Sequence, residues 1–362
     1  MQIETTSRAA YGCRQRLAQA RPRSGAALLA LVSIACLAIA GCAARKPAEI
    51  SSSDLVLGTV CSIRMTAGGS DAAAQAAFAR LHEIEATLTV NKEGSQIDAV
   101  NTAAGKEAVK VGPEAVAILS KGLHYAEISD GAFDPSVGPL VKLWGIGTDH
   151  ARLPSQAEID RARALIGWRD VVLDAAAGTV YLKRPGMALD LGSATKGFAA
   201  DEVADILKSR GVTSGIVDLG GNILVIGSKP DGSPWRIGLQ NPEKERGTYM
   251  GIASLADKTM VTSGIYERYF DQDGVRYHHI LDTKTGYPVQ NGLTSVTVIA
   301  DKSFDADGVT TMLFALGREK GMALANELGL SVIMLDADHR VYMTQGVSKF
   351  FEITDPAYTL AE

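Results

Sequence analysis

The spacing of apolar positions predicts a chain in which amphipathic helices alternate irregularly with short strands. In Asp71–Leu88, apolar side chains recur along one stripe (Phe78, Leu81, Ile84 and Leu88), as in a helix packed on a core. Three more helices are predicted from a proline start, a Ser–Glu capping box and a closing glycine. They cover Pro113–Ile128, Ser155–Ile166 and Lys196–Arg210.

Short runs of β-branched and aromatic residues predict strands between these helices. Two of them, within Ser214–Ser228, are expected to form a hairpin that turns at Gly220-Gly221-Asn222. The other predicted strands are Leu55–Met65, Val171–Asp174, Thr179–Leu182, Trp235–Gln240, Gly251–Ala256, Tyr277–Leu281, Thr294–Ile299 and Ser331–Asp336. This mixture predicts an α+β fold with mainly antiparallel sheets flanked by helices, built as one large domain or as two fused lobes.

The N-terminus has the pattern of an export signal. A leader with five arginines precedes an apolar run, Ala26–Ala40, which has signal-peptide length and is short for a spanning helix. The run ends in a lipobox, so Cys42 is expected to be the lipidated first residue of a bacterial lipoprotein; an uncleaved anchor is the alternative. We predict a signal peptide over 1–41, a lipidated tether over 42–53 and a catalytic domain over 54–355.

Charge and cysteine content narrow the class of protein. Removing residues 1–41 takes away five arginines and one glutamate, so the formal net charge changes from −5 to −9. The mature chain has no basic face and no nucleic-acid signature, and attachment to the periplasmic side of the cell membrane is expected to come from the lipid. Apart from Cys42, only Cys61 remains, so a large core must stabilise the fold without an internal disulfide.

One helical segment brings oxygen ligands together. In Asp305–Gly317, the residues Asp307, Thr310 and Thr311 fall at i, i+3 and i+4, so one carboxylate and two hydroxyls share a helix face. Such oxygens suit a hard cation such as Mg²⁺, which is bound through one or two carboxylates and completed by substrate phosphates. The alternative is an ordinary helix start with an aspartate cap.

Four other segments combine glycine with acidic, hydroxyl or basic residues. Gly131–Leu140 could form a rigid wall for a planar ligand, and Asp190–Gly197 opens a helix whose N–H groups favour phosphate and whose turn offers a carbonyl to a metal. Asp218–Asn222 is better explained as a hairpin turn. Of the adjacent His278 and His279, only one can face a shared site, because strand neighbours point to opposite faces. Zinc, Walker A, nucleophile-elbow and Rossmann patterns are absent from the sequence.

Taken in order, these segments resemble the ApbE family, the lipoprotein FAD:protein FMN transferases. The matching elements are Leu57-Gly58-Thr59, the 131–140 run, Asp-Leu-Gly-x-x-x-Lys-Gly from 190, Asp-Leu-Gly-Gly-Asn from 218, Thr-Ser-Gly-x-Tyr-Glu-Arg from 262, His-Ile-Leu-Asp-x-x-Thr-Gly from 279 and Ala-Asp-Gly-x-x-Thr from 306. Seven elements in order behind a lipobox make the resemblance specific, and they cover nearly the whole mature chain.

The resemblance implies a reaction, a cofactor and a partner. FMN would pass from FAD to a Thr or Ser hydroxyl of a membrane-bound or exported redox protein that carries a flavinylation motif, with Mg²⁺ at the pyrophosphate and release of AMP. The implied metal ligands are the carbonyl of Ser193 and the side chains of Asp307, Thr310 and Thr311. The implied FAD contacts, in a flavin cleft, are Leu57, Asn91, Ala132, Phe133, Asp134, Asp190, Lys196 and Leu281. His279 would be the base, which agrees with the need of a neutral hydroxyl for a proton acceptor.

Some residues depart from the family pattern. Asn91 stands where a ring-stacking tyrosine is often found, so the flavin wall is expected to be altered. Thr283 replaces a proline, and Ile265 replaces a polar residue. Two alternatives to the transferase stay open on sequence grounds: a Mg²⁺-dependent FAD pyrophosphatase that forms FMN and AMP, and a non-catalytic flavin-binding lipoprotein. The pairing of Asp307 with a candidate base argues against the second.

Overall fold

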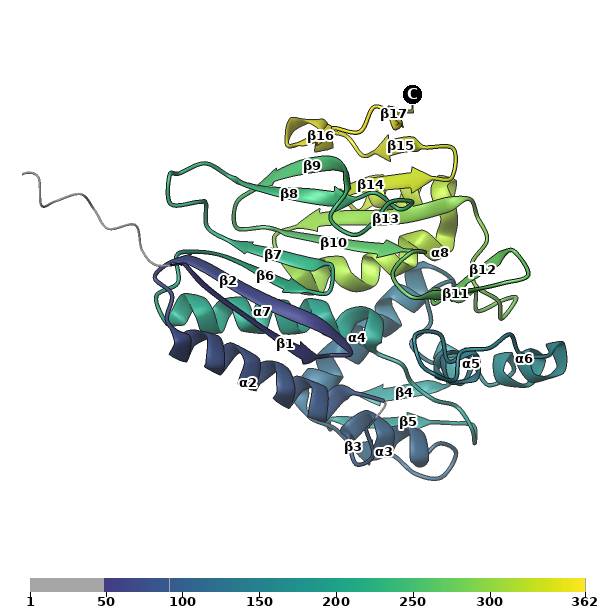
Figure 1. Cartoon of the computed structure of the whole chain (residues 1–362). Coiled ribbons are helices and arrows are strands. Elements are labelled where there is room, and N and C mark those ends of the chain that lie inside the picture. Colours follow the sequence, from purple (N-terminus) through teal and green to yellow (C-terminus); the bar gives the residue numbers. More distant parts are fainter. Residues whose placement is uncertain (1–48, 91, 362) are drawn as a thin grey trace, which may run out of the picture. The chain divides into compact units, whose positions relative to one another are not determined.

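A long sheet with helices on one face organises the part of the chain that the computed structural model describes, residues 49–90 and 92–361 (Figure 1). All neighbouring strands are antiparallel except the last pair, which is parallel. From edge to edge the strands are β1 (Ile50–Val56), β2 (Thr59–Ala67), β6 (Ser214–Leu219), β7 (Asn222–Ile226), β10 (Thr259–Gly264), β13 (Leu293–Ala300), β14 (Ser331–Asp336), β15 (Arg340–Met343) and β17 (Thr359–Leu360).

The other described strands form smaller sheets. One contains β16 (Phe351–Ile353), β9 (Tyr249–Leu255) and β8 (Trp235–Gln240), and another contains β3 (Val109–Lys110), β5 (Thr179–Leu182) and β4 (Val171–Asp174). A separate hairpin is formed by β11 (Tyr269–Gln272) and β12 (Val275–His278). The predicted α+β class with mainly antiparallel sheets is confirmed.

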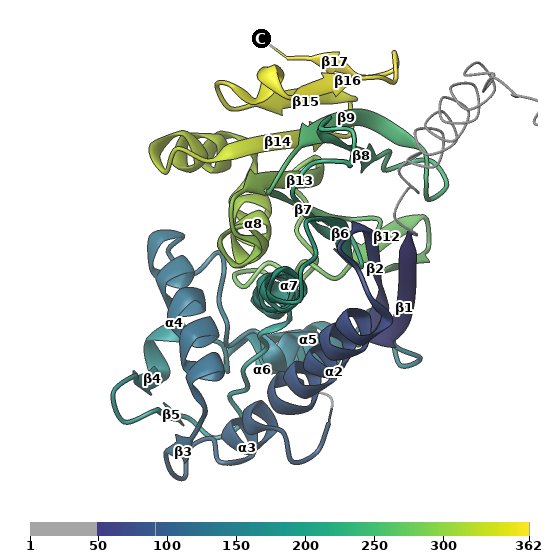
Figure 2. The same ribbon diagram turned by 90° about the vertical axis from the view of Figure 1, so that its left-hand side faces the viewer.

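Two long helices lie side by side against the main sheet, and others pack outside them (Figure 2). These two are α7 (Gly192–Ser209) and α8 (Ser303–Glu327). The remaining helices are α2 (Asp71–Leu88), α3 (Gln96–Thr102), α4 (Pro113–Ile128), α5 (Gly138–Trp144) and α6 (Gln156–Arg163), with short 3₁₀ turns at Trp168–Asp170 and Val347–Lys349. Within the described ranges, no helix combines the length and apolar character needed to cross a bilayer.

The main sheet is buried on both faces at its centre. In β14, Val332 and Met334 join the core under α8, whereas Ile333 and Leu335 pack toward β8 and β9. This alternation follows from the two-residue period of a strand, and it explains why β14 is an almost continuous apolar run. The helices α7 and α8 are thus fixed between the sheet and the outer helices.

Several predicted boundaries are wrong, and three of them change how the start and end of the domain are described. Leu55–Met65 is not one strand, because Leu57 (φ 56°) and Gly58 (φ 67°) form a turn between β1 and β2. The predicted tether ends too late, since β1 begins at Ile50 and pairs with β2 along its whole length. The domain also runs past residue 355, because β17 pairs with β15.

Candidate active site

The start of α8 is held by its neighbour α7. The backbone N–H groups of Ser303 and Phe304 donate to the two carboxylate oxygens of Asp201, both at 3.0 Å. Asp307 lies one turn further into α8, so it is not the helix cap that was the alternative explanation for it. Its carboxylate is therefore available for another role.

Asp307 of α8 accepts a hydrogen bond from a backbone N–H of α7. The N–H of Gly197 donates to Oδ2 of Asp307 at 2.7 Å. In a regular α-helix this N–H would bond to the carbonyl of Ser193, four residues earlier. The Ser193 carbonyl therefore lies one helical turn from the N–H that Asp307 accepts, close to a buried carboxylate.

The contact between α7 and α8 requires glycine at position 197. A Cβ there would lie 2.4 Å from the Ser303 carbonyl oxygen and 2.6 Å from Cβ of Asp307. We expect Gly197→Ala to lower the free energy of unfolding by about 1–3 kcal/mol, because it separates the two helices. Urea denaturation measures this change. Gly122→Ala in α4 is the matched control, since its Cβ would meet Pro135 at 3.5 Å; equal losses in both variants would contradict the prediction.

Two threonine hydroxyls of α8 face a serine of β10. Thr310 Oγ1 donates to the carbonyl oxygen of Asp307 at 2.6 Å and lies 2.7 Å from Ser263 Oγ. Thr311 Oγ1 lies 3.2 Å from the same serine oxygen and is less buried than Thr310. Thr311 is therefore better placed to bind an added ligand, whereas the Thr310 hydroxyl is already hydrogen-bonded to the α8 backbone and to Ser263. Ser263 was missed as a site residue, although it belongs to the Thr-Ser-Gly motif.

Burial governs the charge of Asp307. It raises the pKa of this carboxyl to about 6, against the opposing effects of Lys196, the Gly197 N–H and the Asn222 amide. The Asn222 Nδ2 atom makes no hydrogen bond of ordinary geometry in the described chain, yet its dipole favours the charged form of Asp307. Because burial outweighs these three groups, a bound cation would further stabilise the charged form of Asp307.

The oxygen atoms around Asp307 match a hard cation better than a soft one. Among the described residues, no group of three or more His, Cys, Asp and Glu side chains could hold a metal. The oxygen groups near Asp307 are instead the hydroxyls of the following turn of α8 and the backbone of the first turns of α7. That set fits Mg²⁺ with part of its shell supplied by substrate oxygens.

Within the described chain, His279 forms a ring hydrogen bond through one nitrogen and none through the other. Its backbone N–H donates to the Arg268 carbonyl at 3.1 Å, and its Nδ1 lies 3.3 Å from the same oxygen. This arrangement assigns the proton to Nδ1 and leaves Nε2 as an acceptor. The neighbouring His278 is buried instead, with Nε2 2.9 Å from the Val289 carbonyl. The expectation that only one of the two faces a shared site agrees with these opposite surroundings.

The surroundings of His279 keep its ring neutral. The ring is only half-buried from solvent, yet the surrounding protein displaces enough water for desolvation to be the largest cause that lowers the pKa of His279, followed by the charges of Arg268, His278 and Lys196. Lys196 also acts on Asp307, so its ammonium group lies within electrostatic reach of both the carboxylate and the histidine. A neutral imidazole at neutral pH has the protonation state that a general base requires.

The two glycine-rich loops proposed to contact FAD are tied to each other. The N–H of Asp190 donates to the Pro135 carbonyl at 2.8 Å, and its Oδ1 accepts from the Gly192 N–H at 2.8 Å. Asp134 is buried and accepts from the backbone and hydroxyl of Ser136 and from the backbone of Trp168. Asp134 thus organises its loop through three hydrogen bonds.

The remaining predicted FAD contacts have different surroundings. Phe133 is buried edge-on against Tyr125, with ring centroids 5.9 Å apart, whereas Leu281 is buried in a different apolar cluster. Leu57 occupies the β1–β2 turn, where its N–H donates to the carboxylate of Glu85 at 2.6 Å. Asn91 and Cys42 lie outside the described residues.

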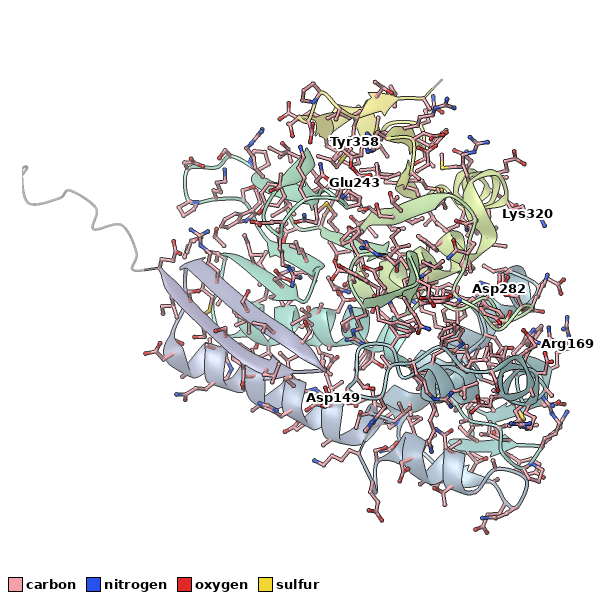
Figure 3. All side chains as sticks on the ribbon, turned by 45° about the vertical axis from the view of Figure 1, so that its right-hand side comes forward. Asp149, Arg169, Glu243, Asp282, Lys320 and Tyr358 are labelled. Carbon is pink, nitrogen blue, oxygen red and sulfur yellow. The ribbon has the colours of Figure 1, made fainter. Side chains whose placement is uncertain are left out.

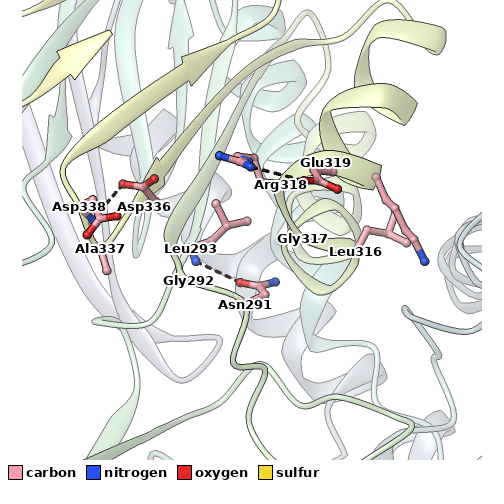
Figure 4. A pocket seen from close by; sticks show the side chains of 11 residues that line it. Asn291, Gly292, Leu293, Leu316, Gly317, Arg318, Glu319, Asp336, Ala337 and Asp338 are labelled. Carbon is pink, nitrogen blue, oxygen red and sulfur yellow. Dashed lines mark hydrogen bonds and ion pairs between the residues drawn. The ribbon is translucent and has the colours of Figure 1, made fainter. Parts of the chain in front are cut away.

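Two surface hollows flank α8 where it bends at Gly317, which has φ 79° and ψ 175°. One, of about 370 Å³, is lined by Ala132, Asp282 and Lys320 among others; Figure 3 labels the last two. The other, of about 400 Å³, lies beside Asn291 and Arg318 (Figure 4). Neither is lined by Asp307, Thr311 or His279. Only the first adjoins a predicted FAD contact, Ala132.

Comparison with known proteins agrees with this geometry. The model of the ApbE family matches residues 57–334. The chain belongs to the ApbE family. A Treponema pallidum relative named FAD:protein FMN transferase is 37% identical over 349 residues, covering 91% of this chain and 96% of that protein. A Klebsiella pneumoniae relative of the same name is 38% identical, covering 81% of this chain and 91% of its own length.

A solved structure extends the match to the fold. The ApbE protein of Thermotoga maritima superposes with a TM-score of 0.78 at 32% identity, covering 84% of this chain and 99% of that one. The family predicted from the seven motifs is therefore confirmed, and with it the class of enzyme that its relatives represent. The individual roles predicted for the site residues remain predictions.

Proposed function

We propose that this chain transfers the FMN moiety of FAD to a Thr or Ser hydroxyl of a redox protein and releases AMP. The observation that carries the proposal is the Gly197 N–H donated to Asp307, because it sets a buried carboxylate against the first turns of α7, one turn from the Ser193 carbonyl. The family relatives named FAD:protein FMN transferase supply the substrate class. The candidate base His279 supplies the chemistry that a binding protein would not need.

A divalent cation fits the oxygen set described above. Asp307, Thr311 and the Ser193 carbonyl would hold Mg²⁺, with Thr310 supporting them through its bond to the Asp307 backbone. When bound, the ion would neutralise charge on the pyrophosphate oxygens, as in other phosphoryl transfers. The raised pKa of Asp307 means that metal binding and proton binding compete at this carboxylate.

The reaction requires one proton transfer on the protein side. The acceptor hydroxyl oxygen attacks the phosphorus of the FMN half, and its proton passes to Nε2 of His279. The bond from that phosphorus to the oxygen bridging the two phosphates breaks, and AMP leaves with the bridging oxygen. FMN stays on the acceptor as a phosphodiester, and His279 later releases its proton to water.

The cellular setting is also part of the proposal. Cys42 would carry the lipid that anchors the mature chain on the periplasmic side of the cell membrane, and the acceptor would be a membrane-bound or exported redox protein. Support comes from the leader and the lipobox. Globomycin treatment should accumulate the uncleaved precursor, and a Cys42→Ser chain that fractionates with the membrane as the wild type does would contradict lipid anchoring.

Product accounting tests the reaction. The mature chain is incubated with FAD, Mg²⁺ and purified exported redox domains, and AMP, free FMN and protein-bound FMN are quantified by liquid chromatography. Transfer predicts bound FMN equal to AMP. Free FMN equal to AMP would instead indicate a pyrophosphatase, and intact FAD would indicate a binding protein. Omitting Mg²⁺ and adding a chelator should abolish AMP release.

The pH dependence follows from the environment of His279. Because burial and nearby positive charge lower the pKa of this histidine from 6.5, its basic form persists further into acid than that of an ordinary histidine. At saturating Mg²⁺, kcat/KM for transfer should stay level from pH 8 to below 6.5 and fall only at lower pH. A half-maximal point at or above 6.5 would contradict the proposed environment.

A further inference from the structure

We propose that Arg268 is a further catalytic residue, whose guanidinium binds the phosphate of the departing AMP. This inference rests on the proposed function and deepens it. Arg268 is the last residue of the Thr-Ser-Gly-x-Tyr-Glu-Arg motif, just before β11. It is neither a proposed metal ligand nor the candidate base. Three observations support the proposal: the contacts of the Arg268 side chain, its lack of a carboxylate partner among the described residues, and its electrostatic effect on two site residues.

The Arg268 side chain joins segments that are far apart in the sequence. Its Nη2 lies 3.5 Å from the Gly58 carbonyl oxygen, at the turn that also contains Leu57. Its stem runs over Gly147, where an added Cβ would come within 3.1 Å of its Cδ, so the glycine provides the room. The backbone carbonyl oxygen of Arg268 accepts hydrogen bonds from the backbone N–H and the ring Nδ1 of His279. The guanidinium thus lies where a predicted flavin contact and the candidate base meet.

Arg268 lacks the carboxylate partner that nearby arginines have. Nε of Arg276 lies 3.0 Å from Oδ1 of Asp271, and Nη2 of Arg246 lies 4.0 Å from Oε2 of Glu267. Among the described residues, no carboxylate oxygen is within 4.0 Å of the Arg268 guanidinium, whose side chain is exposed. An arginine held in place but unpaired, beside a site for a phosphate-containing substrate, has its donors free for an anion.

The charge of Arg268 reaches two site residues from different elements. Burial raises the pKa of Asp190, which lies just before α7, and the charge of Arg268 opposes this rise. The same charge adds to desolvation in lowering the pKa of His279. The other charged groups that act on His279 are His278 and Lys196. A cation that acts on both the start of α7 and the base would oppose the charge that grows on a phosphate leaving this site.

The chemistry needs such a group. When the bond between the phosphorus of the FMN half and the bridging oxygen breaks, its electron pair stays on that oxygen, and AMP gains negative charge. Two N–H groups of a guanidinium can donate to phosphate oxygens in a bidentate geometry that a lysine cannot match. Removing one aligned donor from a transition-state site typically costs about 10²–10³-fold in rate.

The test compares Arg268→Gln and Arg268→Lys with Arg246→Gln, which removes the same charge from a nearby exposed arginine. AMP is the first probe, titrated calorimetrically with and without Mg²⁺. We expect Arg268→Gln to weaken AMP binding about 10-fold and to slow transfer about 100-fold, with Arg268→Lys between it and the wild type. Arg246→Gln should match the wild type in both measurements.

A pH profile separates catalysis from a merely structural role. Loss of the Arg268 charge should move the acid limb of kcat/KM to higher pH in the Gln variant but not in the Lys variant. Unchanged AMP binding and transfer in Arg268→Gln would overturn the inference. Wild-type chain that binds AMP but forms no protein-bound FMN would count against the proposed function instead, so the two failures are distinguishable.

Discussion

Asp307→Asn should reduce FMN transfer by about three orders of magnitude, because it removes the charge that holds the metal. The substituted amide oxygen can still accept the Gly197 N–H, so the contact between α7 and α8 is retained. Burial already raises the pKa of the native carboxyl, so loss of its charge should not destabilise the metal-free fold at neutral pH. Single-turnover transfer, measured across a Mg²⁺ titration, gives the rate and the apparent metal affinity.

Asp305→Ala is the matched control for this prediction. Asp305 lies on the same helix, is exposed and pairs with Lys121, so its loss removes an acidic charge without touching the proposed ligands. It should change transfer less than twofold, since exposed ion pairs contribute at most about 1 kcal/mol to stability. Equal loss of activity in both variants, or an unchanged Mg²⁺ requirement in Asp307→Asn, would contradict the metal role.

Replacing the two adjacent histidines should separate catalysis from stability. His279→Gln is expected to lower the transfer rate by about 10²–10⁴-fold, the range that general-base catalysis provides. It should leave the free energy of unfolding nearly unchanged, because the ring makes only one weak hydrogen bond to the Arg268 carbonyl. Rapid-quench transfer and urea denaturation of the same preparation give both quantities.

His278→Gln serves as the counterpart, with the opposite expected outcome. Its ring is buried, hydrogen-bonded to the Val289 carbonyl and edge-on to Phe314 at 5.8 Å. Its loss should cost about 1–3 kcal/mol of stability, the cost of an unpaired buried polar group, while the folded variant keeps most of its activity. If His278→Gln lost activity and His279→Gln lost stability, the two side chains would have been assigned to the wrong faces.

Much of the fold follows from local sequence signals. Asp71–Leu88 and Pro113–Ile128 match α2 and α4, because a capped amphipathic stripe and a proline start fix their ends. The β6–β7 hairpin follows from its glycine pair, whose Gly221 N–H donates to Asp218. The turn at Leu57 could not be predicted in this way, since a leucine with positive φ leaves no local signal.

The residues of the candidate site could be proposed from the sequence, but the contacts between them could not. The Asp307 helix face and the preference for one histidine follow from helix and strand periodicity. The role of Gly197 depends on how α7 and α8 approach each other, which is a tertiary contact between residues 110 positions apart. Ser263 and Arg268 belonged to a matched motif, yet only the folded chain brings them to Thr311 and His279.

The most direct test of the account is the intact mass of an acceptor domain after incubation with the mature chain, FAD and Mg²⁺. The account predicts a mass increase equal to one FMN phosphodiester, mapped by fragmentation to a Thr or Ser, and its loss in Asp307→Asn but not in Asp305→Ala. An acceptor that keeps its mass while FAD is cleaved to FMN and AMP would contradict it, as would an FMN adduct that forms equally well in Asp307→Asn.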